Sequence, residues 1–355
     1  MLIYLLLASG LFMGWSLGSV DSASAFGTAV STRVVKYRTA VTIIAVMVIL
    51  GAILGGAGNI HSLSDLAESN KVIATENEAK QALDNGLIET LRLKSALKAA
   101  IIFVCAALTV SVMSYLKLPV SANQALTGAI IGWGLCYANY SDPTILIPNL
   151  KKIGIFASTW ILNPLGAGII SFILVTLVNR FLTERLTSLS SYDKIIKWGY
   201  LIAGTFAAFS IGTNSSASIT ALYYDATGTG ANLLTNAQIA AIIGGVAIAI
   251  GAITYSKRVM LTVGSGIAEI TQTDGFVVVI AMALTVFIMK TLLKIPVSNS
   301  QAIVGAVMGA GLTRGVKFVN FNKFKSIAIA WVTSPTAAAL LTFLVGICTK
   351  GFFGK

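Results

Sequence analysis

The sequence predicts an all-α polytopic membrane protein built from two inverted repeats of about five apolar segments each, with broken or re-entrant helices at the repeat interface. Three observations lead to this prediction. The chain of 355 residues is 56% hydrophobic and only 11% charged, whereas soluble domains carry about 25% charged residues. Its uncharged runs are about as long as a bilayer-crossing helix, roughly 20 residues. A nineteen-residue stretch occurs twice, at Lys117–Leu135 and Lys294–Leu312, with eleven identical positions.

The apolar segments divide the chain into two similar halves. Residues 1–179 form the first repeat, interrupted at 59–98 by a polar extramembrane insert with six acidic side chains. Residues 180–193 form an inter-repeat loop, and residues 194–355 form the second repeat. The expected segments of the first repeat are about 1–31, 39–58, 99–116, 118–138 and 153–179. Those of the second are about 198–224, 228–256, 272–289, 295–313 and 326–349.

Further matches between the halves support a duplication. Trp160 and Pro164, in the last segment of the first half, match Trp331 and Pro335 in the last segment of the second. A Ser/Gly/Ala pattern that begins at Ser16 recurs from Ser210, and all the matching blocks keep the same order. The first twenty residues are apolar but lack a basic start, so they predict a first span and not a cleaved signal peptide.

The basic residues indicate how the segments are oriented. Five crossings per half would invert the second half relative to the first. With Arg33, Lys36 and Arg38 in the cytoplasm, inversion also places most of the remaining basic residues of the short loops inside, as the positive-inside rule requires. We therefore expect a multi-pass protein of the plasma membrane with both termini outside the cell.

Both copies of the duplicated stretch place Pro-Val-Ser at the start of an apolar, glycine-rich helix pattern. Serine at such a position caps free N–H groups, and that is one interpretation of Ser121 and Ser298. The same free N–H groups and the positive end of the helix dipole also bind anions. In transporters with broken helices, two such ends from opposed repeats meet at a substrate. The second interpretation is favoured because the motif is duplicated.

Asp21 lies in an otherwise uncharged run. An ionisable residue in a membrane span is a functional candidate, and its carboxylate could bind Na⁺ or carry a proton. The alternative is a helix cap or a position at the water interface. The matching residue of the second half is Ser215, so any cation site would be asymmetric.

Matching polar clusters, Ser19–Ser24 and Thr213–Ser218, interrupt the first segment of each half. Their side chains, including Asn214, could line a hydrated cavity. Packing of helices through small residues would explain the serines equally well.

Several function classes are excluded. The single histidine, His61, lies in the polar insert, and the sequence contains no metal-binding cluster, nucleophile–base pair or nucleotide-binding loop. The sequence therefore does not predict an enzyme, a bound cofactor or a nucleic-acid partner, and its net charge of +12 follows membrane topology. A transporter and an anion channel remain, because both can use helix ends to bind anions.

Three motifs resemble the inorganic phosphate transporter (PiT) family. Gly18–Thr28 resembles its GANDVANAFGT motif, and the two Pro-Val-Ser segments resemble its repeated PVSTTHA motif. Thr262–Phe276 resembles the stretch that precedes the second copy. The resemblance implies inverted repeats, uptake of an inorganic oxyanion together with Na⁺ or H⁺, and a homodimer.

The resemblance also implies site residues. Asp21 would act in cation coupling together with Ser215. The oxyanion would be bound by the remaining candidates, which are Ser24, Ser121, Asn123, Asn214, Ser218, Ser298, Asn299 and Ser300. Glutamines, Gln124 and Gln301, replace the histidines of both motif copies. Loss of the second motif aspartate leans toward sulfate, and the usual substrate of the family favours phosphate. We therefore expect phosphate symport, with a sulfate permease as the alternative.

Overall fold

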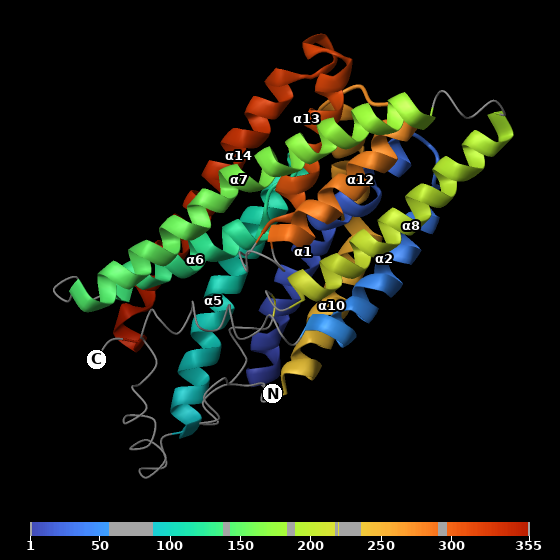
Figure 1. Ribbon diagram of the computed structural model, residues 1–355. Helices are drawn as coiled ribbons and strands as arrows, with labels where there is room; N and C mark the ends of the chain where they lie inside the picture. Colours follow the sequence, from blue (N-terminus) through green and yellow to red (C-terminus); the bar gives the residue numbers. More distant parts are fainter. Residues whose placement is uncertain are drawn as a thin grey trace.

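The structure is a computed structural model that describes residues 2–56, 88–137, 143–182, 189–216, 219, 236–289 and 297–353. These residues form a helical bundle, shown in Figure 1. The helices of the first half are α1 (Leu2–Ser31), α2 (Tyr37–Gly51), α5 (Ile88–Tyr115), α6 (Ala122–Tyr137) and α7 (Pro143–Leu182). A π-helical turn, Ala52–Gly56, extends α2. The five apolar segments predicted for this half are thus present as helices.

The second half has the same order of helices. They are α8 (Leu189–Ser215), α10 (Ala237–Tyr255), the short α11 (Lys257–Leu261), α12 (Gln272–Phe287), α13 (Asn299–Arg314) and α14 (Phe321–Phe353). A π-helical turn at Thr262–Gly266 follows α11, and a 3₁₀ turn at Val316–Phe318 precedes α14. The capping box of Thr271 and Asp274 starts α12 at Gln272, where the sequence analysis placed the start of the segment 272–289.

Several predicted boundaries differ from the structure, among them the start of α7, which lies at Pro143 and not near residue 153. Helix α5 begins at Ile88, inside the stretch expected to be the polar insert, because a helix can continue beyond the apolar part of its sequence. Helices α7 and α8 likewise extend into the expected inter-repeat loop, of which residues 183–188 lie outside the described residues. Residues 57–87, most of the insert, also lie outside them.

Six helices of the described part are long and apolar enough to cross a membrane. The six spans are Tyr37–Gly56, Ala96–Tyr115, Ser158–Phe181, Ser191–Ser215, Gln238–Tyr255 and Phe321–Gly351. Helix α1 differs from these spans because every side chain from Ser16 to Ala29 is buried within the protein. It lies inside the bundle in Figure 1.

The helices that carry the duplicated motif are shorter. α6 and α13 have 16 residues each, about 24 Å at 1.5 Å per residue, which is less than the roughly 30 Å of a bilayer core. Ser121 and Ser298, just before their first turns, are buried. Both helices therefore begin inside the protein, as expected for broken or re-entrant helices.

Close helix crossings join the two halves at equivalent positions. The backbones are in contact where glycine faces a carbonyl oxygen. A Cβ atom added to Gly128 would lie 2.1 Å from the carbonyl oxygen of Pro335. One added to Gly305 would lie 2.0 Å from the carbonyl oxygen of Pro164. The first contact joins α6 to α14 and the second joins α13 to α7. Each motif helix therefore packs against the last helix of the other half.

The first two helices of each half also pack against helices of the other half, α1 against α10 and α8 against α2. Gly18 of α1 faces the Ile248 oxygen of α10, and Gly212 of α8 faces the Val48 oxygen of α2. Small residues at such crossings let membrane helices approach closely. These equivalent pairings are what two similar halves related by a twofold axis would produce.

Candidate functional site

The candidate site is centred on Asp21, in the middle of the continuous helix α1. Its side chain is 5% exposed. The Ser300 hydroxyl of α13 donates a hydrogen bond to Oδ1 at 2.7 Å, and the Ser215 hydroxyl of α8 donates to Oδ2 at 3.2 Å. Asp21 is therefore neither a helix cap nor a residue at the water interface. One carboxylate joins the first helix of each half to the second motif helix.

The start of α13 supplies most of the polar groups around Asp21. Ser298 caps the helix, because its hydroxyl accepts from the backbone N–H of Gln301 at 3.3 Å. The Asn299 side chain lies beside the Asp21 carboxylate. Its buried Nδ2 atom has no acceptor among the described residues other than this carboxylate. The cap leaves the Ser298 hydroxyl proton free to donate to another group.

The start of α6 repeats this arrangement. The Ser121 hydroxyl accepts from the backbone N–H of Gln124 at 3.3 Å. Gln124 is 2% exposed, and neither polar atom of its amide has a partner among the described residues. Oδ1 of Asn123 is also buried, and no described residue bonds to it. Both motif serines are therefore caps, and both caps have unpaired amide groups next to them.

Side chains from other helices fix the segments that enter α6 and α13. Asn163 Nδ2 of α7 donates to the Ser298 carbonyl at 2.7 Å, and Asn214 Nδ2 of α8 donates to the Val297 carbonyl at 3.4 Å. Trp331 Nε1 of α14 donates to the Pro119 carbonyl at 3.1 Å. Such bonds satisfy backbone groups that lack partners in a non-helical segment. Asn214, a candidate substrate ligand, thus acts on the backbone that precedes Ser298.

The serines of α1 form hydrogen bonds to other groups inside the helix bundle. Ser24 donates to the Asp21 carbonyl oxygen at 2.6 Å, and Ser19 donates to the Ser16 carbonyl oxygen at 2.7 Å. Ser16 also lies 2.8 Å from Ser111 of α5. These contacts favour helix packing over a hydrated cavity for this cluster. Ser218, another predicted ligand, lies outside the described residues.

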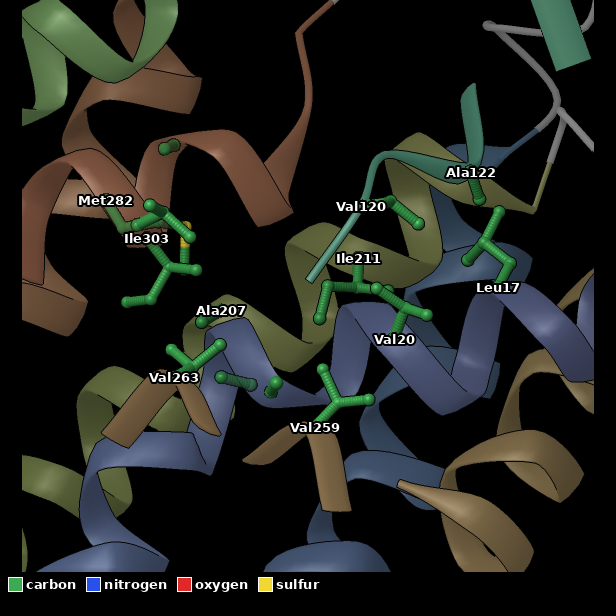
Figure 2. Close-up of a cluster of buried hydrophobic side chains, with 14 of the residues drawn as sticks. Leu17, Val20, Val120, Ala122, Ala207, Ile211, Val259, Val263, Met282 and Ile303 are labelled. Atoms are coloured by element: carbon green, nitrogen blue, oxygen red, sulfur yellow. The ribbon is translucent and has the colours of Figure 1, made fainter. Parts of the chain in front are cut away.

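Apolar side chains surround the polar groups. Figure 2 shows Leu17 and Val20 of α1 within a buried cluster that includes Val120 from the segment before α6 and Ile303 from α13. Both motif helices contact α1. Because few polar groups surround the Asp21 carboxylate, any charge bound beside it would interact mainly with the hydroxyls and amides named above.

Gln124 and Gln301 are the site residues that the sequence-based prediction omitted. Gln301 is 1% exposed, and its buried Nε2 atom has no partner within the residues that the structure describes. Each glutamine is the third residue of its helix, so the two occupy equivalent positions. A buried polar group without a partner costs about 1–3 kcal/mol. The repetition of glutamine three residues after each motif serine was the available sequence signal.

Comparison with known proteins relates the chain to phosphate transporters. A profile described as the phosphate transporter family matches residues 17–342. A protein of Thermococcus kodakarensis, provisionally named a phosphate permease, is 28% identical, with 95% of each chain covered. An Arabidopsis thaliana protein named inorganic phosphate transporter 2-1, chloroplastic, is 25% identical over 99% of this chain and 73% of its own.

A solved structure described as the sodium-dependent phosphate transporter has the same fold. It superposes with a TM-score of 0.77, at 20% sequence identity, and 99% of both chains is covered. The family profile covers nearly the whole chain, including Asp21 and both Pro-Val-Ser segments. On this evidence the chain belongs to the phosphate transporter family, a family of membrane transporters and not of enzymes.

Proposed function

We propose that the protein is a secondary active transporter that moves inorganic phosphate across the plasma membrane together with a cation, Na⁺ or H⁺. The observation that carries this proposal is the set of unpaired amides at the buried starts of α6 and α13. Nε2 of Gln124 and Nε2 of Gln301 are donors without acceptors among the described residues. Together with the dipole ends of two helices, these donors suit an oxyanion.

The acceptors favour phosphate over sulfate. Monohydrogen phosphate carries a proton that needs an acceptor, whereas sulfate is a dianion without one. Oε1 of Gln124 and Oδ1 of Asn123 are buried acceptors that have no donor in the described part of the chain. Sulfate would leave both unpaired, and a protonated phosphate oxygen can bond to one of them.

Asp21 is the proposed cation ligand. Ser300 and Ser215 occupy one position on each carboxylate oxygen, which leaves lone pairs free for Na⁺ or a proton. The cation would offset the charge of the anion beside it. Ser300 was predicted to bind the substrate, and its contact with Asp21 favours a role in cation coupling instead.

The exchanged packing of the halves supports the inverted-repeat arrangement and the proposed division into residues 1–179 and 194–355. Inversion would point α6 and α13 toward each other from opposite sides of the membrane. The outward orientation of both termini and the homodimer stay predictions.

Uptake into proteoliposomes tests the function. We expect labelled phosphate to accumulate above its outside concentration under an inward Na⁺ or H⁺ gradient, each imposed separately. Sulfate should compete weakly. An anion channel would only equilibrate the label, and accumulation of sulfate in preference to phosphate would support the sulfate permease instead.

The glutamines provide a test with two opposite readouts. Gln124→Leu and Gln301→Leu should each lower the apparent affinity for phosphate about tenfold, because each removes a donor to the anion. Each should also raise the melting temperature of the ligand-free protein, because the substitution removes an unpaired amide from the interior. The exposed Gln272→Leu serves as the control. Unchanged affinity in both variants would contradict the assignment.

A further inference from the structure

A polar pocket whose lining does not include Asp21 lies where α5, α11 and the start of α14 meet. Its volume is about 740 Å³, and it is lined by Tyr115, Lys117, Arg258, Leu261, Thr262, Gly266 and Lys323. Three of these seven residues have cationic side chains, and none is acidic. The three cations come from both halves of the chain. The pocket therefore concentrates positive charge at a boundary between the repeats.

Arg258 is held in place by aromatic rings. Its guanidinium carbon lies 5.8 Å from the centre of the Tyr115 ring and 5.7 Å from that of the Tyr255 ring. Cation–π contacts of this kind fix the guanidinium and leave its N–H groups free for a ligand. Lys117 adopts a left-handed backbone conformation, with φ of 61°, as the chain turns from α5 toward the Pro-Val-Ser segment. The Arg258 guanidinium thus has a defined position, and Lys117 enters the pocket from a backbone turn.

The pocket is distinct from the candidate transport site. Its wall includes the π-helical turn Thr262–Gly266, which packs against the end of α1. A Cβ atom at Gly264 would lie 2.3 Å from the Gly27 carbonyl oxygen. Gly27 is six residues after Asp21, or about 9 Å along the helix axis. The positive-inside rule predicts the cytoplasmic side for all three cations.

We propose that this pocket binds a phosphate group. Its partner is a tetrahedral oxyanion, because Arg258 offers a bidentate fork and the two lysines add point charges around it. Free inorganic phosphate and the phosphate of an anionic lipid headgroup present this chemistry alike. The pocket does not depend on the proposed roles of Asp21 or the glutamines, so the two sites can be tested separately.

Binding measured on the full chain in a neutral detergent tests the pocket. Line broadening in phosphorus NMR reports weak binding of inorganic phosphate, and it is measured in the Gln124→Leu/Gln301→Leu background so that the transport site contributes little. Native mass spectrometry reports binding of dioctanoyl phosphatidic acid. The Arg258→Gln/Lys323→Gln double variant should weaken binding of the true ligand about tenfold. Potassium chloride should weaken binding to the unaltered pocket as well, since exposed charges are screened.

Lys325→Gln is the matched control, because Lys325 is exposed, lies near Lys323 and does not line the pocket. Arg258→Lys, which keeps the charge, should retain part of the affinity. A loss confined to inorganic phosphate identifies the free anion as ligand, and a loss confined to phosphatidic acid identifies the lipid headgroup. Equal binding of both probes to the double variant, the control and the unaltered protein overturns the proposal.

Discussion

Phosphate uptake by the Asp21→Asn variant should fall roughly a hundredfold under a cation gradient, equivalent to about 2.7 kcal/mol. Asparagine has the volume of aspartate and keeps an oxygen that can accept from Ser300. The substitution therefore removes the charge with little change of shape. A cation that binds Asp21 loses its counter-charge inside a buried site, and hydrogen bonds to charged groups contribute about 1.5–3 kcal/mol each.

A purely structural role for Asp21 would give a different result. We expect the variant to keep part of its phosphate–phosphate exchange, which needs no net cation movement, while concentrative uptake is lost. Asp193→Asn is the matched control, because Asp193 is an exposed carboxylate on α8. Uptake in Asp21→Asn within twofold of the unaltered protein, at equal amounts in the membrane, would exclude the proposed coupling role.

The Gly305→Ala variant should lose at least about 2 kcal/mol of folding stability. The added methyl group would lie 2.0 Å from the Pro164 carbonyl oxygen, far inside van der Waals contact. Because the obstacle is backbone on a neighbouring helix, no side chain can rotate away to make room. Helices α13 and α7 would have to separate, which also shifts the start of α13. Thermal unfolding in detergent measures the loss.

Glycine-to-alanine substitution at Gly154 of α7, the helix against which α13 packs, should have the opposite effect on stability. Gly154 lies in α7, is exposed, and has no atom within 4 Å of an added Cβ. Alanine there should stabilise by up to about 1 kcal/mol, because glycine is a poor helix former. Equal unfolding temperatures for Gly305→Ala and Gly154→Ala would contradict the close crossing of α13 and α7.

The sequence was sufficient to predict the helices but not all their ends. Long apolar runs are recognised by length alone, so the ten predicted segments correspond to helices α1, α2, α5–α8, α10 and α12–α14. Charged residues mark contact with water, and a helix can continue through them, which is why α5 starts at Ile88 and not near residue 99. The exchange of partners between the halves could not be predicted, because periodicity shows an apolar face and not which helix covers it.

The site was predictable where a motif fixes a residue near a helix start. The capping roles of Ser121 and Ser298 followed from spacing. The contact of Ser300 with Asp21 did not, because consecutive residues of a first helical turn point in different directions. The glutamines were overlooked because they count as departures from a histidine motif. Their lack of partners is visible only when every neighbouring atom is placed.

The exchanged packing of the halves affects how the protein is made. The ribosome delivers α1 and α6 before α10 and α14, the helices against which their glycines pack. Until then, these glycine-lined faces lack their permanent neighbours. Insertion into the bilayer and final assembly are therefore separate stages of biogenesis, and the second cannot finish before the last helix is synthesised.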